Sequence, residues 1–299
     1  MLPRRIEPQL LTSAREAPRG DGWIHEVKYD GFRLLCRVEG GEARLITRGG
    51  EDWTARLRVV AEAVEALETG DAWLDGELVA LAADGRPDFG ALPMAIRGAP
   101  GALPLAYQLF DAPWLEGRDL SRACVLERKA RLEERVRGRC ERGMVRWCDH
   151  LRGSGELLFA QAWRAGLEGI VSKRVGSGYR AGARCRDWLK VKCFRVFRFR
   201  VAGYTPGMGT VFVCASGADG RPVYAGRVAG WARAPVRRDL RAALTPLQCE
   251  RSPFPHSVAR GEPVRWVEPT VEVEVAALEW YPGEKLRHAT LRGVVAPSG

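Results

Sequence analysis

The segment HEVKYDGFR, residues 25–33, places a lone lysine between an apolar run and a glycine. Residues 23–28 have the composition of a strand and Gly31 predicts a turn, so Lys28 is expected at the end of a strand. Only six of the 47 basic residues are lysine, and the others are arginine. Arginine keeps its proton, whereas a lysine amine can become a nucleophile. Lys28 is therefore the first candidate for covalent chemistry.

Five later segments carry charged or aromatic residues in a regular order: TRGGEDWT (47–54), LDGELV (74–79), YQLFD (107–111), EGIVSK (168–173) and DWLKVK (187–192). With residues 28–33 they resemble the nucleotidyl-transfer motifs of the ATP-dependent DNA ligases, RNA ligases and RNA-capping guanylyltransferases. Four of the six lysines lie in these motifs, which argues against coincidence. The lysines are Lys28, Lys129, Lys173, Lys190, Lys192 and Lys285.

Other phrases resemble the ligase domain of bacterial DNA ligase D, the end-joining ligase. They are IEPQL (6–10), GYTP (203–206), YAGRV (224–228) and LRH (286–288). The resemblance therefore covers residues 6–293. It implies an ATP-dependent DNA ligase that seals nicks or breaks through a lysyl-AMP and a DNA-adenylate, in repair by non-homologous end joining.

The resemblance also implies roles for single residues. Catalysis is assigned to the Lys28 nucleophile, to Asp30 at the 3′-hydroxyl, and to the α-phosphate lysines Lys190 and Lys192. Phosphate contacts are assigned to Arg33 and Arg48, the ribose contact to Glu77, and adenine stacking to Phe110. Glu26, Glu168 and Lys173 complete the cofactor site. Glu77 and Glu168 are the expected metal ligands, and the cofactors are ATP with Mg²⁺ or Mn²⁺.

The chemistry explains why these residue types are needed. A free lysine has a pKa near ~10.4 and is a poor nucleophile at neutral pH. Neighbouring cations, namely Lys190, Lys192 and a bound metal ion, are expected to lower the pKa of Lys28 and to stabilise phosphate charge in the transition state. Lys190 and Lys192 are two residues apart, so one strand face carries both into the site.

The predicted fold class is α+β, with an adenylation domain of antiparallel sheets and helices over residues 1–193. A small OB-fold β-barrel that binds DNA is expected over residues 194–299, after a linker at residues 192–194. Alternating residues predict strands at 195–201 and 271–275. The basic residues of the first of these strands face either phosphates or solvent. Phe110 is either the adenine platform or a core residue.

Within the first domain a hairpin is expected at 32–38 and 42–47, an amphipathic helix at 57–67 and a strand at 74–81. Ser121 and Ser154 are expected to cap helices at 124–137 and 156–165.

Composition is consistent with a polyanionic partner, since the net charge is +10 and +6 of it falls after Cys193. The expected partners are nicked or broken double-stranded DNA, with bacterial Ku and separate end-processing enzymes. No apolar run is long enough for a membrane span, and no zinc spacing is seen among the cysteines. We expect a cytoplasmic, nucleoid-associated monomer.

One departure from the family concerns its sixth motif, an Arg-x-Asp-Lys element. Val295 stands where the arginine is expected, and neither Lys285 nor Arg292 matches the motif. The expected consequence is slow self-adenylation, with sealing of pre-adenylated nicks less affected.

Two alternatives to a DNA ligase stay open on the sequence. An RNA ligase or capping enzyme shares the Lys28 chemistry but does not explain the ligase D phrases. A DNA-end-binding module without catalysis would bind nicks and transfer no AMP.

Overall fold

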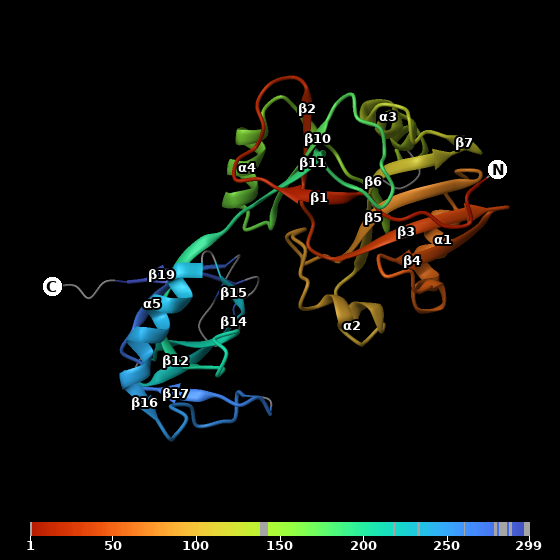
Figure 1. Cartoon of the computed structure of the whole chain (residues 1–299). Helices are drawn as coiled ribbons and strands as arrows, with labels where there is room; N and C mark the ends of the chain where they lie inside the picture. Colours follow the sequence, from red (N-terminus) through yellow and green to blue (C-terminus); the bar gives the residue numbers. More distant parts are fainter. Residues whose placement is uncertain are drawn as a thin grey trace. The chain divides into compact units, whose positions relative to one another are not determined.

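The computed structural model describes residues 2–137, 143–217, 219–231, 234–259, 261–277, 280, 286 and 289–295. Lys285, residues 287–288 and residues 296–299, which enter the comparison with the sixth motif, lie outside these residues. The chain divides into two compact units, residues 1–193 and 194–299. Figure 1 shows the elements of each unit.

The first unit contains a five-stranded sheet in the order β1-β11-β10-β2-β9. Its strands are β1 (Leu10–Ser13), β2 (Trp23–Val27), β9 (Leu151–Arg152), β10 (Gly169–Arg174) and β11 (Arg184–Lys192). Only β1 and β11 of this sheet pair in parallel. Helix α4 (Gly155–Arg164) covers one face, where Ile170, Val191 and Ala162 form an apolar cluster. The other face of this sheet is free to build a site.

A second sheet in this unit has the order β4-β3-β5-β6-β7, with β8 beside β6. Its strands are β3 (Phe32–Glu39), β4 (Glu42–Thr47), β5 (Ala72–Ala80), β6 (Leu105–Leu115), β7 (Arg118–Asp119) and β8 (Val145–Trp147). The associated helices are η1 (Thr54–Leu57), α1 (Arg58–Glu65), α2 (Leu92–Ile96) and α3 (Val125–Val136). Alternate β3 residues Leu34, Cys36 and Val38 enter the main apolar core with Val60 and Val64 of α1. Arg33, Leu35 and Arg37, which alternate with these residues, face the opposite side.

The second unit is a curled sheet in the order β14-β13-β12-β18-β19-β15, with β17 joining β12 to β16. Its elements are β12 (Arg195–Tyr204), β13 (Val211–Ser216), β14 (Pro222–Val228), β15 (Gly230–Trp231), α5 (Ala234–Leu244), η2 (Thr245–Leu247), β16 (Gln248–Cys249), β17 (Arg265–Val267), β18 (Glu272–Ala277) and β19 (Thr290–Val294). β12 pairs with β18 along its first residues and with β17 at its end. This change of partner curls the sheet, as an OB barrel requires. The α+β prediction is confirmed.

The alternation expected at residues 195–201 is present, with Phe197, Phe199 and Val201 in the core of this unit. The arginines between them lie on the outer face. Arg198 lies 3.9 Å from Glu274 of β18, and Arg200 donates to the Ser216 hydroxyl. These arginines therefore lie on the barrel surface, and their contact with phosphates stays a prediction.

The expected hairpin, the helix after it and the strand at 74–81 are confirmed within a few residues, although the helix begins as the 3₁₀ turn η1. Ser154 is the N-cap residue of α4, as predicted, although its side chain makes no hydrogen bond to the helix. The prediction for Ser121 is wrong, because Cys124 is the N-cap residue of α3. The Ser121 amide donates to the Asp119 side chain, and the Ala123 amide donates to the Leu120 carbonyl, so Ser121 lies in a turn before the helix. No helix in the described part of the chain is both long and apolar enough to cross a membrane.

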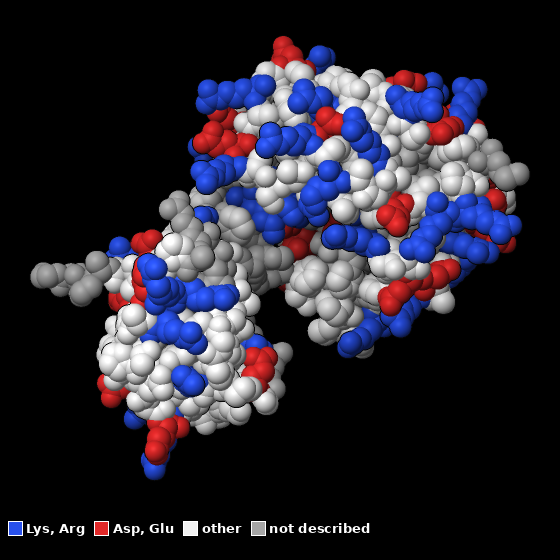
Figure 2. Space-filling model, viewed as in Figure 1, with Lys and Arg blue, Asp and Glu red and all other residues white. Residues whose placement is uncertain are grey.

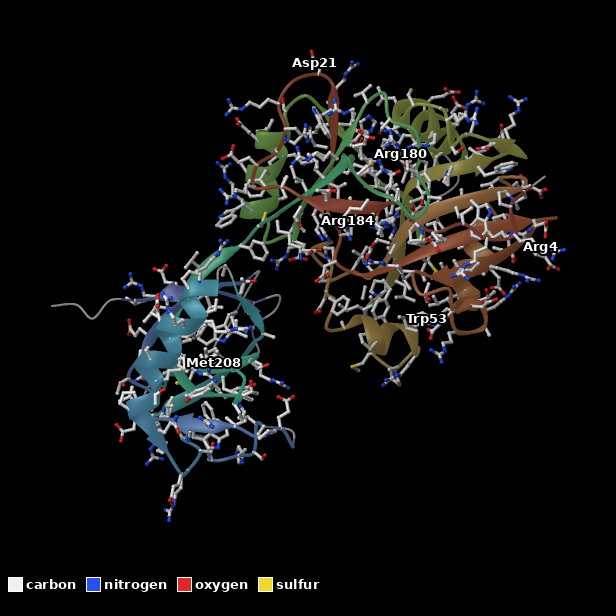
Figure 3. The ribbon with its side chains drawn as sticks, in the orientation of Figure 1. Arg4, Asp21, Trp53, Arg180, Arg184 and Met208 are labelled. Carbon is white, nitrogen blue, oxygen red and sulfur yellow. The ribbon has the colours of Figure 1, made fainter. Side chains whose placement is uncertain are left out.

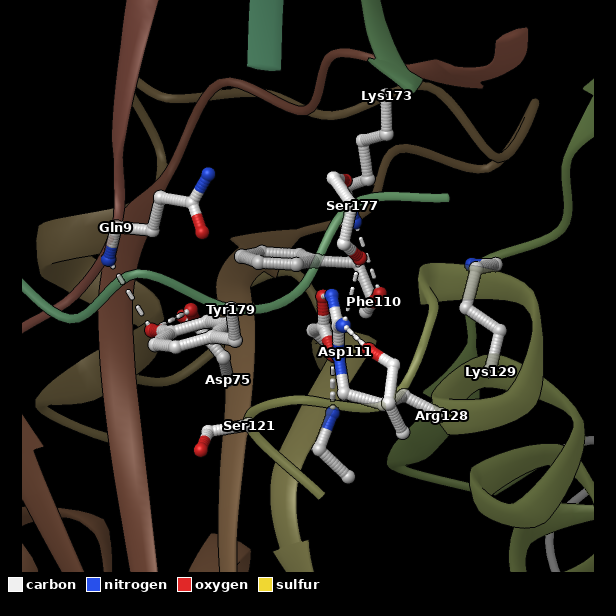
Figure 4. Close-up of polar contacts among 12 residues, drawn as sticks. Gln9, Asp75, Phe110, Asp111, Ser121, Arg128, Lys129, Lys173, Ser177 and Tyr179 are labelled. Atoms are coloured by element: carbon white, nitrogen blue, oxygen red, sulfur yellow. Dashed lines mark hydrogen bonds and ion pairs between the residues drawn. The ribbon is translucent and has the colours of Figure 1, made fainter. Parts of the chain in front are cut away.

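An ion pair with no solvent exposure anchors α3 to the second sheet. Arg128 Nε and Nη2 donate to the two carboxylate oxygens of Asp111 at 2.7 and 2.9 Å, as Figure 4 shows. The remaining guanidinium nitrogen donates to the carbonyls of Ala123 and Ser177. This arrangement satisfies both charges inside the fold.

We expect Asp111→Ala to lower the free energy of unfolding by about 3–5 kcal/mol, because it leaves the buried Arg128 charge unpaired. Urea denaturation monitored by tryptophan fluorescence measures the change. The matched control is Glu127→Ala on the same helix, which removes an exposed partner of Arg131 and should cost below about 1 kcal/mol. Equal losses in the two variants would contradict the prediction.

Candidate functional site

Strand register gathers the motif residues of the first sheet on one face. Glu26 of β2 pairs with Val171 of β10, which pairs with Lys190 of β11. The Lys28 amide, just beyond β2, donates to the Gly169 carbonyl, and Gly169 is the register partner of Lys192. Because side chains alternate along a strand, every second residue shares this face. The set is Glu26, Lys28, Val171, Lys173, Trp188, Lys190 and Lys192.

A cavity that opens to solvent lies between this face and the second sheet, and its volume is about 440 Å³ when the space open to solvent is included. Its lining comprises Leu11, Glu26, Val27, Lys28, Tyr29, Arg33, Glu77, Phe110, Val171, Lys173 and Trp188. Arg33 and Glu77 are register partners on β3 and β5. Apolar and aromatic walls with a few charged groups are typical of a site for a small organic ligand.

Glu168 joins two of the lysines. Lys28 donates to Glu168 Oε2, and Lys192 Nζ lies 2.8 Å from Glu168 Oε1. Burial acts to raise the pKa of Glu168, but Lys28 and Lys192 outweigh it and hold that pKa below its usual value. The pKa of Lys190 is lowered by burial and by repulsion from Lys192 and Lys28. The three lysines and the carboxylate therefore form one electrostatic cluster.

Two glycines let the backbones approach at this cluster. A Cβ at Gly169, whose φ is +148°, would lie 2.1 Å from the Val191 carbonyl oxygen. A Cβ at Gly31 would lie 2.1 Å from the Leu78 carbonyl oxygen. The chain bends at Gly31 between β2 and β3, as expected, but its φ is not positive. The reason for glycine at this position is close contact with β5.

Glu26 lines the cavity and binds two lysines. Lys129 Nζ of α3 lies 2.7 Å from Glu26 Oε1, and Lys173 Nζ lies 2.9 Å from Glu26 Oε2. All three residues are buried. Lys173 also donates to the Phe110 carbonyl at 2.9 Å, and its Nζ lies 4.8 Å from the centroid of the Phe110 ring. Phe110 therefore lines the cavity with a cation against its ring.

Arg33 is held from the opposite side. Its Nε and Nη2 donate to Asp75 at 2.9 and 2.6 Å, and Nη1 donates to the Gln9 carbonyl. Tyr179 donates to Asp75 and accepts from the Gln9 amide, as Figure 4 shows. Arg33 was expected to contact a DNA phosphate, but its Nε and Nη2 groups are already bonded to Asp75. Arg33 has only its remaining N–H groups for a ligand.

Five predicted site residues do not line the cavity. Two of them, Glu168 and Lys192, are linked to Lys28 through the Glu168 carboxylate. Arg48 is exposed beyond the end of β4, and Asp30 is half-buried in the loop between β2 and β3. Lys190 is partly buried beside Lys28 and Lys192 but is not in the lining. Conversely, Trp188, Asp75 and Lys129 were not identified as site residues. The only feature of the sequence that singled out Lys129 was the small number of lysines in the chain.

Glu77 is the second carboxylate at the cavity. Burial raises the pKa of Glu77 to about 8, against the opposing effect of Lys28 and Arg33. The negative charges of Asp75 and Glu168 add to this increase. Among the described residues, no group of three or more His, Cys, Asp or Glu side chains could hold a metal ion. Two carboxylates still fit Mg²⁺, which usually takes one or two of them together with substrate phosphates and water.

The sequence matches the model of the family described as "ATP dependent DNA ligase domain" over residues 8–192. Residues 205–295 match the "ATP dependent DNA ligase C terminal region". The chain belongs to the ATP-dependent DNA ligase family. The family resemblance predicted from the motifs is thus confirmed, and neither alternative, the RNA enzyme or the inactive binding module, is favoured.

Two relatives extend the match over nearly the whole chain. The multifunctional non-homologous end joining protein LigD of Pseudomonas aeruginosa is 38% identical over 310 residues, covering 98% of this chain. The LigD protein of Mycobacterium tuberculosis is 30% identical over 301 residues, covering 97% of it. The chain spans only 36% and 38% of the length of these two proteins.

A solved structure of mycobacterial DNA ligase D complexed with ATP and MES has a TM-score of 0.60 to this ligase chain, with 28% identity. The alignment covers 98% of this chain and 96% of that one. Together with the curled sheet of the second unit, this similarity supports the predicted adenylation domain followed by an OB fold.

We expect Glu77→Gln to stabilise the protein relative to wild type, by more at pH 8 than at pH 5. The pKa of Glu77 is about 8 when folded and that of a free glutamate is near ~4.3 when unfolded, so the unfolded state loses its proton first as pH rises. The folded wild type therefore loses stability between these values, whereas the glutamine variant does not.

Urea midpoints of both proteins at pH 5 and pH 8 test this expectation. Glu42→Gln, at an exposed position of β4, removes the same charge and should show the same difference from wild type at the two pH values. A pH-independent effect of Glu77→Gln would show that Glu77 is already ionised at pH 5.

Proposed function

We propose that this chain is an ATP-dependent DNA ligase that uses Lys28 as its nucleophile. The carrying observation is the position of Lys28, which lines the cavity and is held by the carboxylate that also binds Lys192. In the first step Lys28 Nζ would form a bond to the α-phosphorus of ATP, the bond to pyrophosphate would break, and one amine proton would be released. Lys190 and Lys192 would stabilise the negative charge on the phosphate.

The later steps would transfer the AMP. An oxygen of a DNA 5′-phosphate would attack the phosphorus of lysyl-AMP and free the Lys28 amine. The 3′-hydroxyl of the neighbouring strand end would then attack the DNA-adenylate, forming the phosphodiester bond and releasing AMP. We assign Asp30 to the 3′-hydroxyl and exposed Arg48 to a DNA phosphate, consistent with their positions outside the cavity lining.

For the nucleotide, we propose that the adenine packs against Phe110 and Trp188, whose rings meet edge to face at 6.3 Å. Glu26 is the carboxylate among the described lining residues on this wall, and it can accept from an exocyclic amino group. Lys173 and Arg33 would flank the base, and Glu77 would contact the ribose. The presence of all these residues in the cavity lining supports these roles.

A divalent metal ion, Mg²⁺ or Mn²⁺, would neutralise phosphate charge when bound with ATP. Glu77 and Glu168 are the residues that we propose to hold it. Glu77 would lose its proton, and Glu168 would loosen its contact with Lys28, leaving the amine free to attack.

A basic surface favours DNA as the substrate. Figure 2 shows Lys and Arg side chains across the face of the first unit in view, and Figure 3 labels Arg180 and Arg184 in the region of β1 and β11. Arg184 and Arg186 are exposed residues at the start of β11, the strand that continues to Trp188 and Lys192. Such a run of cations can follow a phosphate backbone.

We further propose that the substrates are nicks and broken ends in non-homologous end joining. The names of the two relatives support this role. A bacterial Ku protein and separate end-processing enzymes would be the partners of this monomeric chain. Ligation of linear duplex DNA with and without Ku, compared with sealing of a nick, tests the partnership.

We expect Lys28→Arg to abolish labelling by α-³²P-ATP, with a loss of about 10²-fold or more, because arginine keeps the positive charge but is no nucleophile. The measurement is radiolabel on the denatured protein, followed by sealing of a nicked duplex. Label retained on this variant would disprove the role of Lys28. Label on wild type without sealing would reduce the proposal to an adenylating enzyme.

We expect the double variant Arg15→Gln/Arg186→Gln to bind nicked duplex more weakly and with a smaller salt dependence. Both side chains are exposed, one after β1 and one on β11. Each lost phosphate contact should reduce the slope of log K against log salt by about 1. Fluorescence anisotropy at several salt concentrations measures it. The control, Arg97→Gln/Arg118→Gln, removes two exposed charges elsewhere, and an equal change there would contradict the assignment.

A further inference from the structure

Lys129 is a buried lysine that lies outside every motif segment. It follows Arg128 on α3 and has no solvent exposure. Its ammonium group donates to the Cys148 carbonyl at 2.7 Å, lies 2.7 Å from Glu26 Oε1, and is 4.8 Å from the centroid of the Trp147 ring. A fully buried lysine is rare unless it is paired. Lys129 does not line the cavity, so any effect on a ligand must act through Glu26.

Glu26 has acceptor capacity left for a ligand. Lys129 Nζ contacts Glu26 Oε1. Lys173 Nζ lies 2.9 Å from Oε2 and 3.1 Å from Oε1. A carboxylate offers about four lone-pair directions, so one further donor can be accepted. Glu26 precedes Lys28 by two residues on the face that lines the cavity. Its orientation therefore bears directly on what binds beside the nucleophile.

The two lysines do not hold Glu26 equivalently. Lys173 lines the cavity itself and also donates to the Phe110 carbonyl, whereas Lys129 approaches from α3. Figure 4 shows Lys129 and Arg128 leaving the same helix. Burial acts to lower the pKa of Lys129, but Glu26 outweighs it and the pKa lies above its usual value. The pKa of Lys173 is lowered by burial in spite of Glu26. Lys129 is thus the more firmly charged partner.

We propose that Lys129 is a positioning residue that fixes the Glu26 carboxylate toward the cavity and so sets the selectivity for adenine over other purine bases. This inference rests on the proposed function. A fixed carboxylate accepts from the 6-amino group of adenine, whereas guanine presents a carbonyl oxygen there and would be repelled. Without Lys129, Glu26 Oε1 would keep only its longer contact with Lys173, and the carboxylate could turn away from the base.

The test is self-adenylation of wild type and Lys129→Met with ATP, GTP and purine riboside triphosphate, which is ATP without the 6-amino group. Methionine keeps similar length and volume without the charge. Wild type should prefer ATP over purine riboside triphosphate in kcat/KM by about 10- to 100-fold, the value of one well-placed hydrogen bond to a charged group. In Lys129→Met the preference should fall by about 5-fold or more, chiefly through a higher KM for ATP.

Leu132→Ala is the matched control, because Leu132 is buried on the same helix and touches the apolar core. It should lower stability, because it leaves a cavity in the core, and leave the ATP preference unchanged. A purely structural role of Lys129 would lower labelling by all three nucleotides equally, which would overturn the inference. An absence of preference in wild type would overturn it too, even if Lys129→Met did not fold. Labelling of wild type by none of the three nucleotides would instead refute the proposed function.

Discussion

The Glu168 carboxylate, shared by Lys28 and Lys192, is the interaction on which the site depends. Lys28, Lys190 and Lys192 lie on one face of a sheet, and three ammonium groups so close together repel one another. Glu168 is nearly fully buried and provides the compensating charge. The same contacts bring together residues 140 positions apart in the chain. One buried carboxylate thus makes it possible to concentrate the lysines where a nucleophile needs cationic neighbours.

The backbone around Glu168 imposes a second constraint. The next residue, Gly169, pairs with Lys192 and lies where any side chain would meet the Val191 carbonyl. Gly31 is under a similar constraint from β5, three residues after the nucleophile. A larger residue at either position would separate strands whose register aligns the charged groups. Glycine at these two positions is therefore explained by close packing of main chains.

Much of the fold and the site could be predicted from the sequence, because the signals were local. Alternation placed Lys190 and Lys192 on one face, and the order of the motifs identified Lys28, Glu77, Phe110 and Glu168. The pairing partners could not be predicted in this way. Arg33 was assigned to a phosphate, yet Asp75 and the Gln9 carbonyl, from separate segments, hold its guanidinium. Such contacts depend on how the two sheets pack against each other, and this packing cannot be predicted from any one short segment of sequence.

The charges around the cavity do not balance. Arg128 and Arg33 each form an ion pair with one carboxylate, Asp111 and Asp75 respectively. In contrast, Glu26 pairs with two lysines, Lys129 and Lys173. Glu168 likewise pairs with both Lys28 and Lys192. Lys190 has no ion pair among the described residues, and Glu77 is largely protonated at neutral pH because its pKa is about 8. The cavity wall therefore carries an excess of positive charge. In a buried setting such an excess is unfavourable unless a ligand supplies anions. A nucleotide with its phosphates would supply them, so the sharing of one carboxylate by two lysines leaves the protein prepared for a negatively charged substrate.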